Sequence, residues 1–151
     1  MNLSSSNTPL ENYHGIPKGW SKAEILSTYH DLGGLNISKI PEATEPGAPS
    51  WLPDRKNWLQ YRAAIQTIIK LVQASDPAAI ELAIRYIELN YFGSYSGYLR
   101  ERLARGLKQQ KLSEDQSRRL MSHFRNLIDK NQCFLEFREY KKLRNQLLTK
   151  N

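Results

Sequence analysis

Arginines and tyrosines are concentrated in one stretch of the chain, residues 90–111, which reads NYFGSYSGYLRERLARGLKQQK. Its cationic side chains alternate with leucines at helical spacing, and tyrosines precede them. Arginine and lysine bind phosphate oxygens, while aromatic rings stack on unpaired bases. The combination of residue types therefore suggests recognition of nucleic acid, with DNA and RNA both open.

Further cations follow this stretch and extend the predicted nucleic-acid site. Because phosphate contacts carry little sequence information, we expect binding that weakens steeply with salt. A DNA-reading helix-turn-helix is disfavoured, since its second helix would present Glu114 and Asp115 to the groove. The predicted site consists of Arg100, Arg102, Arg105, Lys108, Arg118, Arg119, Arg125, Arg138, Lys141, Lys142 and Arg144, with Tyr95 and Tyr98 as stacking side chains.

The net charge of +7 is unevenly distributed along the chain. Residues 1–93 hold 8 Lys and Arg against 9 Asp and Glu, whereas residues 94–151 hold 14 against 6. Such asymmetry favours an anionic partner, most often nucleic acid. An adaptor or inhibitor that binds an acidic protein surface is the alternative. It would use the same arginines, with Trp20, Trp51 and the tyrosines as hot spots.

Motifs for catalysis and metal binding are missing from the sequence. His14, His30 and His123 have no second ligand at metal-binding spacing, and no phosphate-binding glycine loop or nucleophile elbow is present. A metal-independent nuclease using His123 or His30 as acid and base is conceivable, but such a constellation arises by chance in almost any basic helical protein. We therefore predict a non-enzymatic protein without metal or cofactor.

The cysteine content and the hydropathy of the sequence indicate the cellular compartment. Cys133 is the single cysteine, which excludes an intramolecular disulfide and fits a reducing environment. The first residues lack the basic and apolar regions of a secretory signal, and no apolar run reaches the length of a membrane span. We expect a cytoplasmic protein that does not use a membrane.

Apolar residues recur every three or four positions, which predicts an all-α fold: a small bundle of five or six helices with an extended, Pro-rich N-terminal strap. Residues 1–53 comprise a polar tail, a short helix that starts at the Ser21–Glu24 capping box and ends near Asp31, and the strap. Trp51, Leu35, Ile37 and Ile40 are the expected anchors of the strap.

Residues 54–151 form the predicted helical domain, which begins with a neutral hairpin over 54–92. Asp54 and Asp76 are the expected caps of its two helices, and Pro77 suits the first helical position. Ala63 and Ala64 fall beside the apolar stripe of the first helix and are not expected to add core. The expected inner positions are Trp58, Tyr61, Ile65, Ile68, Ile69 and Val72 on the first helix and Ile80, Ala83, Ile84, Ile87 and Tyr91 on the second.

Three basic helices are predicted over residues 94–149. Gly93 and Gly97 permit a sharp break between the hairpin and this set, with a new helix cap at Ser94 or Ser96. A second capping box lies at Ser113–Gln116, and the last helix runs from about Cys133 to Leu148. The expected inner positions are Leu99, Leu103 and Leu107 (or Gly106), then Leu120, Phe124, Leu127 and Ile128, then Phe134, Phe137, Leu143 and Leu147.

Overall fold

A computed structural model of the chain describes residues 15–35, 37, 54–93, 95–134 and 136–149, and within these residues it contains six helices and no strand. They are α2 (Lys22–Asp31), α3 (Arg55–Gln73), α4 (Pro77–Leu89), α5 (Ser96–Leu107), α6 (Glu114–Asp129) and α7 (Phe137–Thr149). The predicted all-α class is confirmed. Except for Ile37, which packs against the core, the predicted strap lies outside the described residues. Among these helices, none has the length and apolar character that crossing a bilayer requires.

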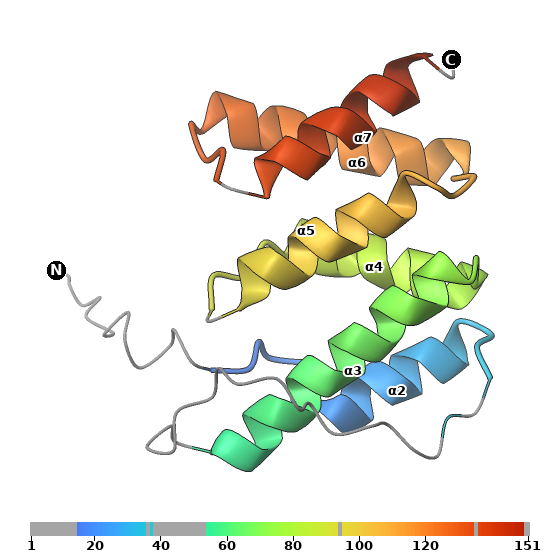
Figure 1. Ribbon diagram of the computed structural model, residues 1–151, viewed down its shortest axis with the longest axis vertical. Coiled ribbons are helices and arrows are strands. Elements are labelled where there is room, and N and C mark those ends of the chain that lie inside the picture. The colour runs from blue at the N-terminus through green and yellow to red at the C-terminus, as the bar shows by residue number, and fades with distance from the viewer. Residues whose placement is uncertain (1–14, 36, 38–53, 94, 135, 150–151) are drawn as a thin grey trace, which may run out of the picture.

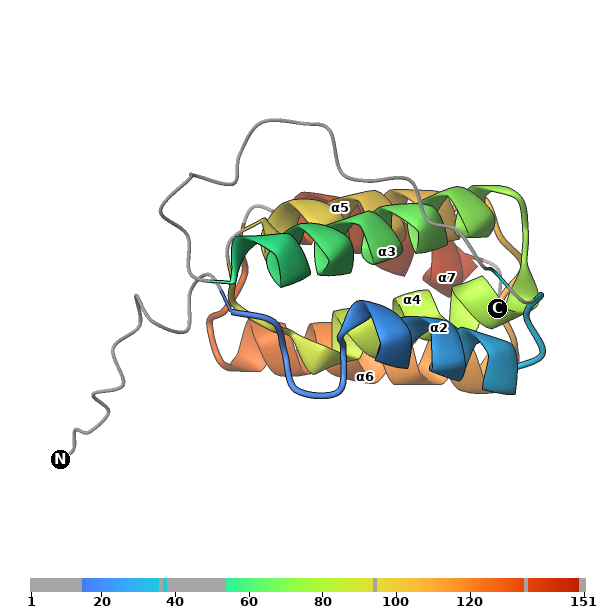
Figure 2. The same ribbon diagram turned by 90° about the horizontal axis from the view of Figure 1, so that it is seen from below.

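The helices form two layers (Figures 1 and 2). One layer contains α3, α5 and α7, and the other contains α2, α4 and α6. From α3 onward each helix runs antiparallel to the next, and successive helices alternate between the layers (Figure 2). As a result, α5 and α7 lie side by side although α6 separates them in the sequence.

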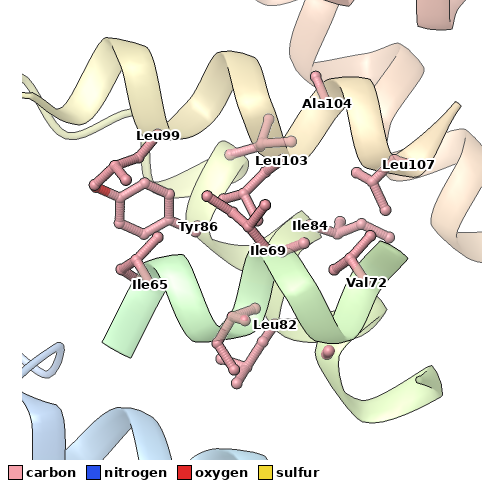
Figure 3. Packing of buried hydrophobic residues seen from close by; sticks show 14 of the residues in the cluster. Ile65, Ile69, Val72, Leu82, Ile84, Tyr86, Leu99, Leu103, Ala104 and Leu107 are labelled. Atoms are coloured by element: carbon pink, nitrogen blue, oxygen red, sulfur yellow. The ribbon is translucent and has the colours of Figure 1, made fainter. Parts of the chain in front are cut away.

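The centre of the core lies where α3, α4 and α5 meet. Ile69 and Val72 of α3 approach Leu103 and Leu107 of α5, with Ile84 of α4 beside them (Figure 3). All five side chains are buried. These residues belong to the expected apolar stripes, so periodicity identified them correctly. Tyr91, expected on the inner face of the second helix, instead follows α4 and is half-buried.

Helix α3 is buried on more than one face, which corrects the expectation for its alanines. It packs against α2, α4 and α5. Ala63 and Ala64, expected outside the core, are 4% and 0% exposed. A single apolar stripe describes a helix at the surface, whereas a helix with three neighbours also buries the small residues beside the stripe.

Local helix-start signals were predicted correctly at three positions. Ser21 and Ser113 both form complete capping boxes, with Glu24 and Gln116 as their partners. Asp76 accepts hydrogen bonds from the backbone N–H groups of residues 78 and 79, and Pro77 is the first residue of α4. Each signal acts within four residues, so tertiary structure has little opportunity to override it.

The other two predicted caps differ in the structure. Asp54 does occupy the capping position of α3, but its side chain makes no capping hydrogen bond. Asp54 is in the left-handed conformation (φ 55°) and its carboxylate accepts from the Asn57 amide instead of a backbone N–H. At α5 the capping position is Tyr95 (φ 73°). Ser96 lies one residue inside the helix, and its hydroxyl accepts from Gly93 N–H and donates to Gly93 C=O. That hydroxyl closes the tight connection from α4. Ser94, the other predicted cap, lies outside the described residues.

The connection between α6 and α7 is longer than expected. Asn131 adopts a left-handed conformation (φ 55°) after α6, and α7 begins at Phe137 instead of near Cys133. Phe134 therefore precedes the helix and is 51% exposed. Ile128 and Leu35 were also expected to be buried and are 42% and 79% exposed.

Candidate nucleic-acid interface

Three cationic side chains converge on one carboxylate between α5 and α7. Lys108 Nζ lies 2.8 Å from Glu139 Oε1, while Arg105 Nη2 and Lys142 Nζ each lie 3.5 Å from Oε2. The Lys108 ammonium, paired with this carboxylate, lowers the pKa of Glu139 below its usual range, so the carboxyl is ionised at neutral pH. We call these four residues the α5–α7 seam; it carries more positive than negative charge.

Charged and aromatic side chains extend from the seam toward the start of α5. Arg105 also approaches Glu101, at 3.4 Å, one helical turn earlier. Arg102, half-buried on α5, places its guanidinium 5.6 Å from the ring centroid of Tyr98. Tyr98 is 46% exposed. Cationic and aromatic groups thus follow one another along α5, as the sequence predicted.

Several cations of the C-terminal half form no ion pair with a carboxylate of the described residues. Arg125, Arg138 and Lys141 are exposed. Arg144 is half-buried on α7, and its Nε atom has no hydrogen-bond partner. The set consists of Arg102, Lys111, Arg125, Lys130, Arg138, Lys141 and Arg144.

Arg100 was expected to belong to the nucleic-acid site, but the structure buries it. Its side chain is 2% exposed. Nε and Nη2 donate to Glu136 Oε2 at 3.1 and 2.7 Å, and Nη1 donates to the carbonyl oxygen of Tyr91. The arginine thereby ties α5 to the α4–α5 and α6–α7 connections, and its guanidinium does not face solvent.

The arginines of α6 lie in the other layer from the seam (Figure 2). Arg119 donates hydrogen bonds to Glu88 and Glu81 of α4, and these bonds raise the pKa of its guanidinium. Arg118 pairs with Asp115 within α6. These pairs neutralise much of the positive charge, so the expected basic surface does not run continuously over all three helices.

Tyr95 and Tyr98 were predicted together but occupy different environments. The ring of Tyr95 is half-buried, 6.3 Å from Trp58 in an edge-to-face arrangement, and the Arg62 guanidinium lies 4.6 Å from its centroid. Tyr98 meets Tyr95 edge-to-face at 5.0 Å and retains exposed ring surface. Tyr98 is therefore available to a ligand, whereas Tyr95 supports it from the protein side.

Two phenylalanines that were not part of the predicted site lie near the start of α5. Phe92 and Phe134 form an edge-to-face pair, 5.2 Å between centroids, and are 48% and 51% exposed. Phe134 also lines a surface recess of about 670 Å³. The recess is lined by Gly97, Tyr98, Glu101, Cys133, Phe134 and Glu136. Phe92 follows directly after Tyr91, so its aromatic neighbours in the sequence could have indicated that it belongs to the site. Phe134 was missed because it was predicted to lie inside the last helix.

No arrangement for metal binding is found within the residues that the structure describes: none of their His, Cys, Asp and Glu side chains form a group of three or more that could hold an ion. His123 is half-buried beside Tyr140, and the thiol of Cys133 is exposed. No protein-family model matches this chain, and no curated protein or solved structure is significantly similar to it.

Proposed function

We propose that this protein is a non-enzymatic nucleic-acid-binding protein, or a subunit of a nucleoprotein complex, and that the α5–α7 seam binds the phosphate backbone. The observation that carries the proposal is the convergence of Arg105, Lys108 and Lys142 on the single carboxylate of Glu139. Such a group retains excess positive charge after internal pairing, which suits a polyanion.

Cations that form no ion pair with a described carboxylate flank the seam on both helices. Arg102 is half-buried on α5, and Arg138 and Lys141 are exposed on α7. Because α5 and α7 are neighbours in one layer, cations from both helices are available to successive phosphates along one strand or duplex. Each phosphate that such a side chain neutralises releases counterions, so affinity would fall with rising salt.

The alternative is an adaptor that binds an acidic protein surface. The exposed pair of Phe92 and Phe134 favours it, because aromatic side chains beside arginines dominate the energetics of protein interfaces. Both functions would use the arginines of α5, and the adaptor would add this aromatic pair near the start of the helix. Binding to an acidic protein surface would also depend on salt, so salt dependence does not distinguish the two functions. A direct titration with nucleic acid does.

The test is a titration of labelled DNA and RNA, single-stranded and duplex, at two or more salt concentrations. The variant Arg102→Gln/Arg138→Gln/Lys141→Gln leaves the Glu139 ion pairs intact. We expect it to weaken binding to every nucleic acid tested. The slope of log affinity against log salt should become shallower by about 0.7–0.9 for each phosphate that the variant no longer neutralises.

A matched control removes the same charge from the neutral half of the chain. Lys18, Lys56 and Lys70 are exposed. Their joint replacement by glutamine lowers the net charge equally, and we expect near wild-type binding. If both triple variants weakened binding equally, the interaction would depend on the net charge of the protein and not on this surface. Failure of the wild-type protein to bind any DNA or RNA at low salt would reject the proposed function in favour of the adaptor.

A further inference from the structure

The recess at the start of α5 is lined by aromatic side chains and lies beside cationic side chains. Tyr98 and Phe134 come from different segments, α5 and the α6–α7 connection, and both line it. Both connections at this end of the bundle, before α5 and before α7, lie close together (Figures 1 and 2). With a volume of about 670 Å³, the recess falls within the roughly 300–1,000 Å³ typical of small-ligand sites.

The aromatic rings of the recess are held in place by neighbours that leave part of their surface open. Tyr95 packs edge-to-face on Tyr98, and Phe92 does the same on Phe134. Phe92 in turn lies over the buried Arg100, whose guanidinium carbon is 5.5 Å from its ring centroid. Exposed apolar surface of this kind, concentrated at one place, is typical of a binding site.

The carboxylates that line the recess are paired with arginines. Glu136 accepts two hydrogen bonds from Arg100, and Glu101 lies 3.4 Å from Arg105. Repulsion of a negatively charged ligand is therefore reduced. Arg105 also belongs to the α5–α7 seam, so the recess and the seam are directly linked by one side chain.

We propose that this recess takes an unpaired nucleobase, so that the ligand of the seam is single-stranded; the inference rests on the proposed function. Tyr98 and Phe134 offer ring surface to the base, and Arg102, which lies over the ring of Tyr98, is placed for the adjoining phosphate. In a duplex the faces of a base are covered by its neighbours, whereas a flexible single strand can turn a base out onto an aromatic side chain.

The test compares a labelled single-stranded oligonucleotide of about 12 nucleotides, free of self-complementarity, with the duplex of the same sequence. We expect the wild-type protein to bind the single strand more tightly at equal salt. The variant Tyr98→Leu/Phe134→Leu should bind the single strand about tenfold or more weakly than the wild-type protein does. It should retain duplex affinity, because the cations are unchanged.

The matched control is Ile128→Ala/Leu148→Ala, which removes exposed apolar side chains that do not line the recess. We expect wild-type affinities from it, and far-UV circular dichroism should show both variants folded. Unchanged single-strand affinity in Tyr98→Leu/Phe134→Leu, or equal weakening for single strand and duplex, would overturn the base site while leaving backbone binding in place. Absence of binding to either form by the wild-type protein would reject the proposed function itself.

Discussion

At the scale of single residues, Arg100 and Arg102 show how two positions in a helix change the role of one side-chain type. Two residues correspond to about 200° of rotation in an α-helix, so the two arginines point to nearly opposite sides. Arg100 points inward and is paired with Glu136, whereas Arg102 lies against the partly exposed ring of Tyr98. A charged residue near the apolar stripe has to be assessed for a buried partner before it is assigned to a ligand.

Removing the buried arginine should strongly destabilise the fold. Replacement of Arg100 by Met leaves Glu136 buried without its ion-pair partner, and breaking a buried pair in this way costs about 3–5 kcal/mol. We expect a decrease of that size in the free energy of unfolding, measured with urea.

The matched control is Arg118→Met, since Arg118 pairs with Asp115 but is 71% exposed. An exposed pair contributes less than about 1 kcal/mol, so this variant should remain close to wild type. If Arg100→Met proved as stable as Arg118→Met, the buried pair would not hold the connections around α5 together.

At the scale of elements, α6 carries a titratable group on its inner side. It packs against α4 and α7, and burial lowers the pKa of His123 below its ordinary value. Glu88 of α4 opposes this shift and Arg100 of α5 adds to it. Tyr140 of α7 meets the imidazole edge-to-face at 6.3 Å, and Nε2 has no hydrogen-bond partner. The folded protein therefore favours neutral His123.

Stability should fall as the pH decreases from 7.5 to 5.5. With the pKa lowered in the folded state, the unfolded chain binds more protons than the folded one below its own pKa of about 6.5. The contribution of neutral His123 is thus present above that pH and is lost on acidification toward the folded pKa. Urea unfolding at the two pH values measures it.

His123→Leu should reduce this pH dependence, because the half-buried titratable group is gone. His30→Gln is the matched control, since His30 is exposed on α2, and we expect it to keep the wild-type pH dependence. The same pH dependence in His123→Leu as in the wild-type protein would assign the titration to another group.

The elements also show which features the sequence could predict. Capping boxes and the apolar stripes of α3, α4 and α5 were predictable because they depend on residues within one or two turns. The start of α7 and the exposure of Phe134 were not, because they depend on the α6–α7 connection and on the packing of Phe134 against Phe92. For the site, residue types indicated phosphate binding, but ion pairing across helices decided which cations remain available to a ligand.

At the scale of the molecule, α5, the first of the three basic helices, connects the neutral hairpin to the other two. It packs on α3 and α4 on one side and on α7 on the other. Leu103, 1% exposed, lies in its middle against the hairpin. The boundary between residues 54–92 and 94–149 therefore separates regions of different charge, but the core continues across it, and we expect the described helices to unfold together.

This continuity can be measured with two probes. All three tryptophans, Trp20, Trp51 and Trp58, precede the basic helices, so their fluorescence reports on the N-terminal part, whereas far-UV circular dichroism reports on every helix. Leu103→Ala should lower the free energy of unfolding by about 2–5 kcal/mol, as deletion of a buried leucine does, and should shift both urea transitions to the same midpoint. Leu148→Ala, at a side chain 59% exposed, is the control with little expected change. A fluorescence transition that separates from the circular dichroism transition would instead indicate two independently folding units, with α5 belonging to only one of them.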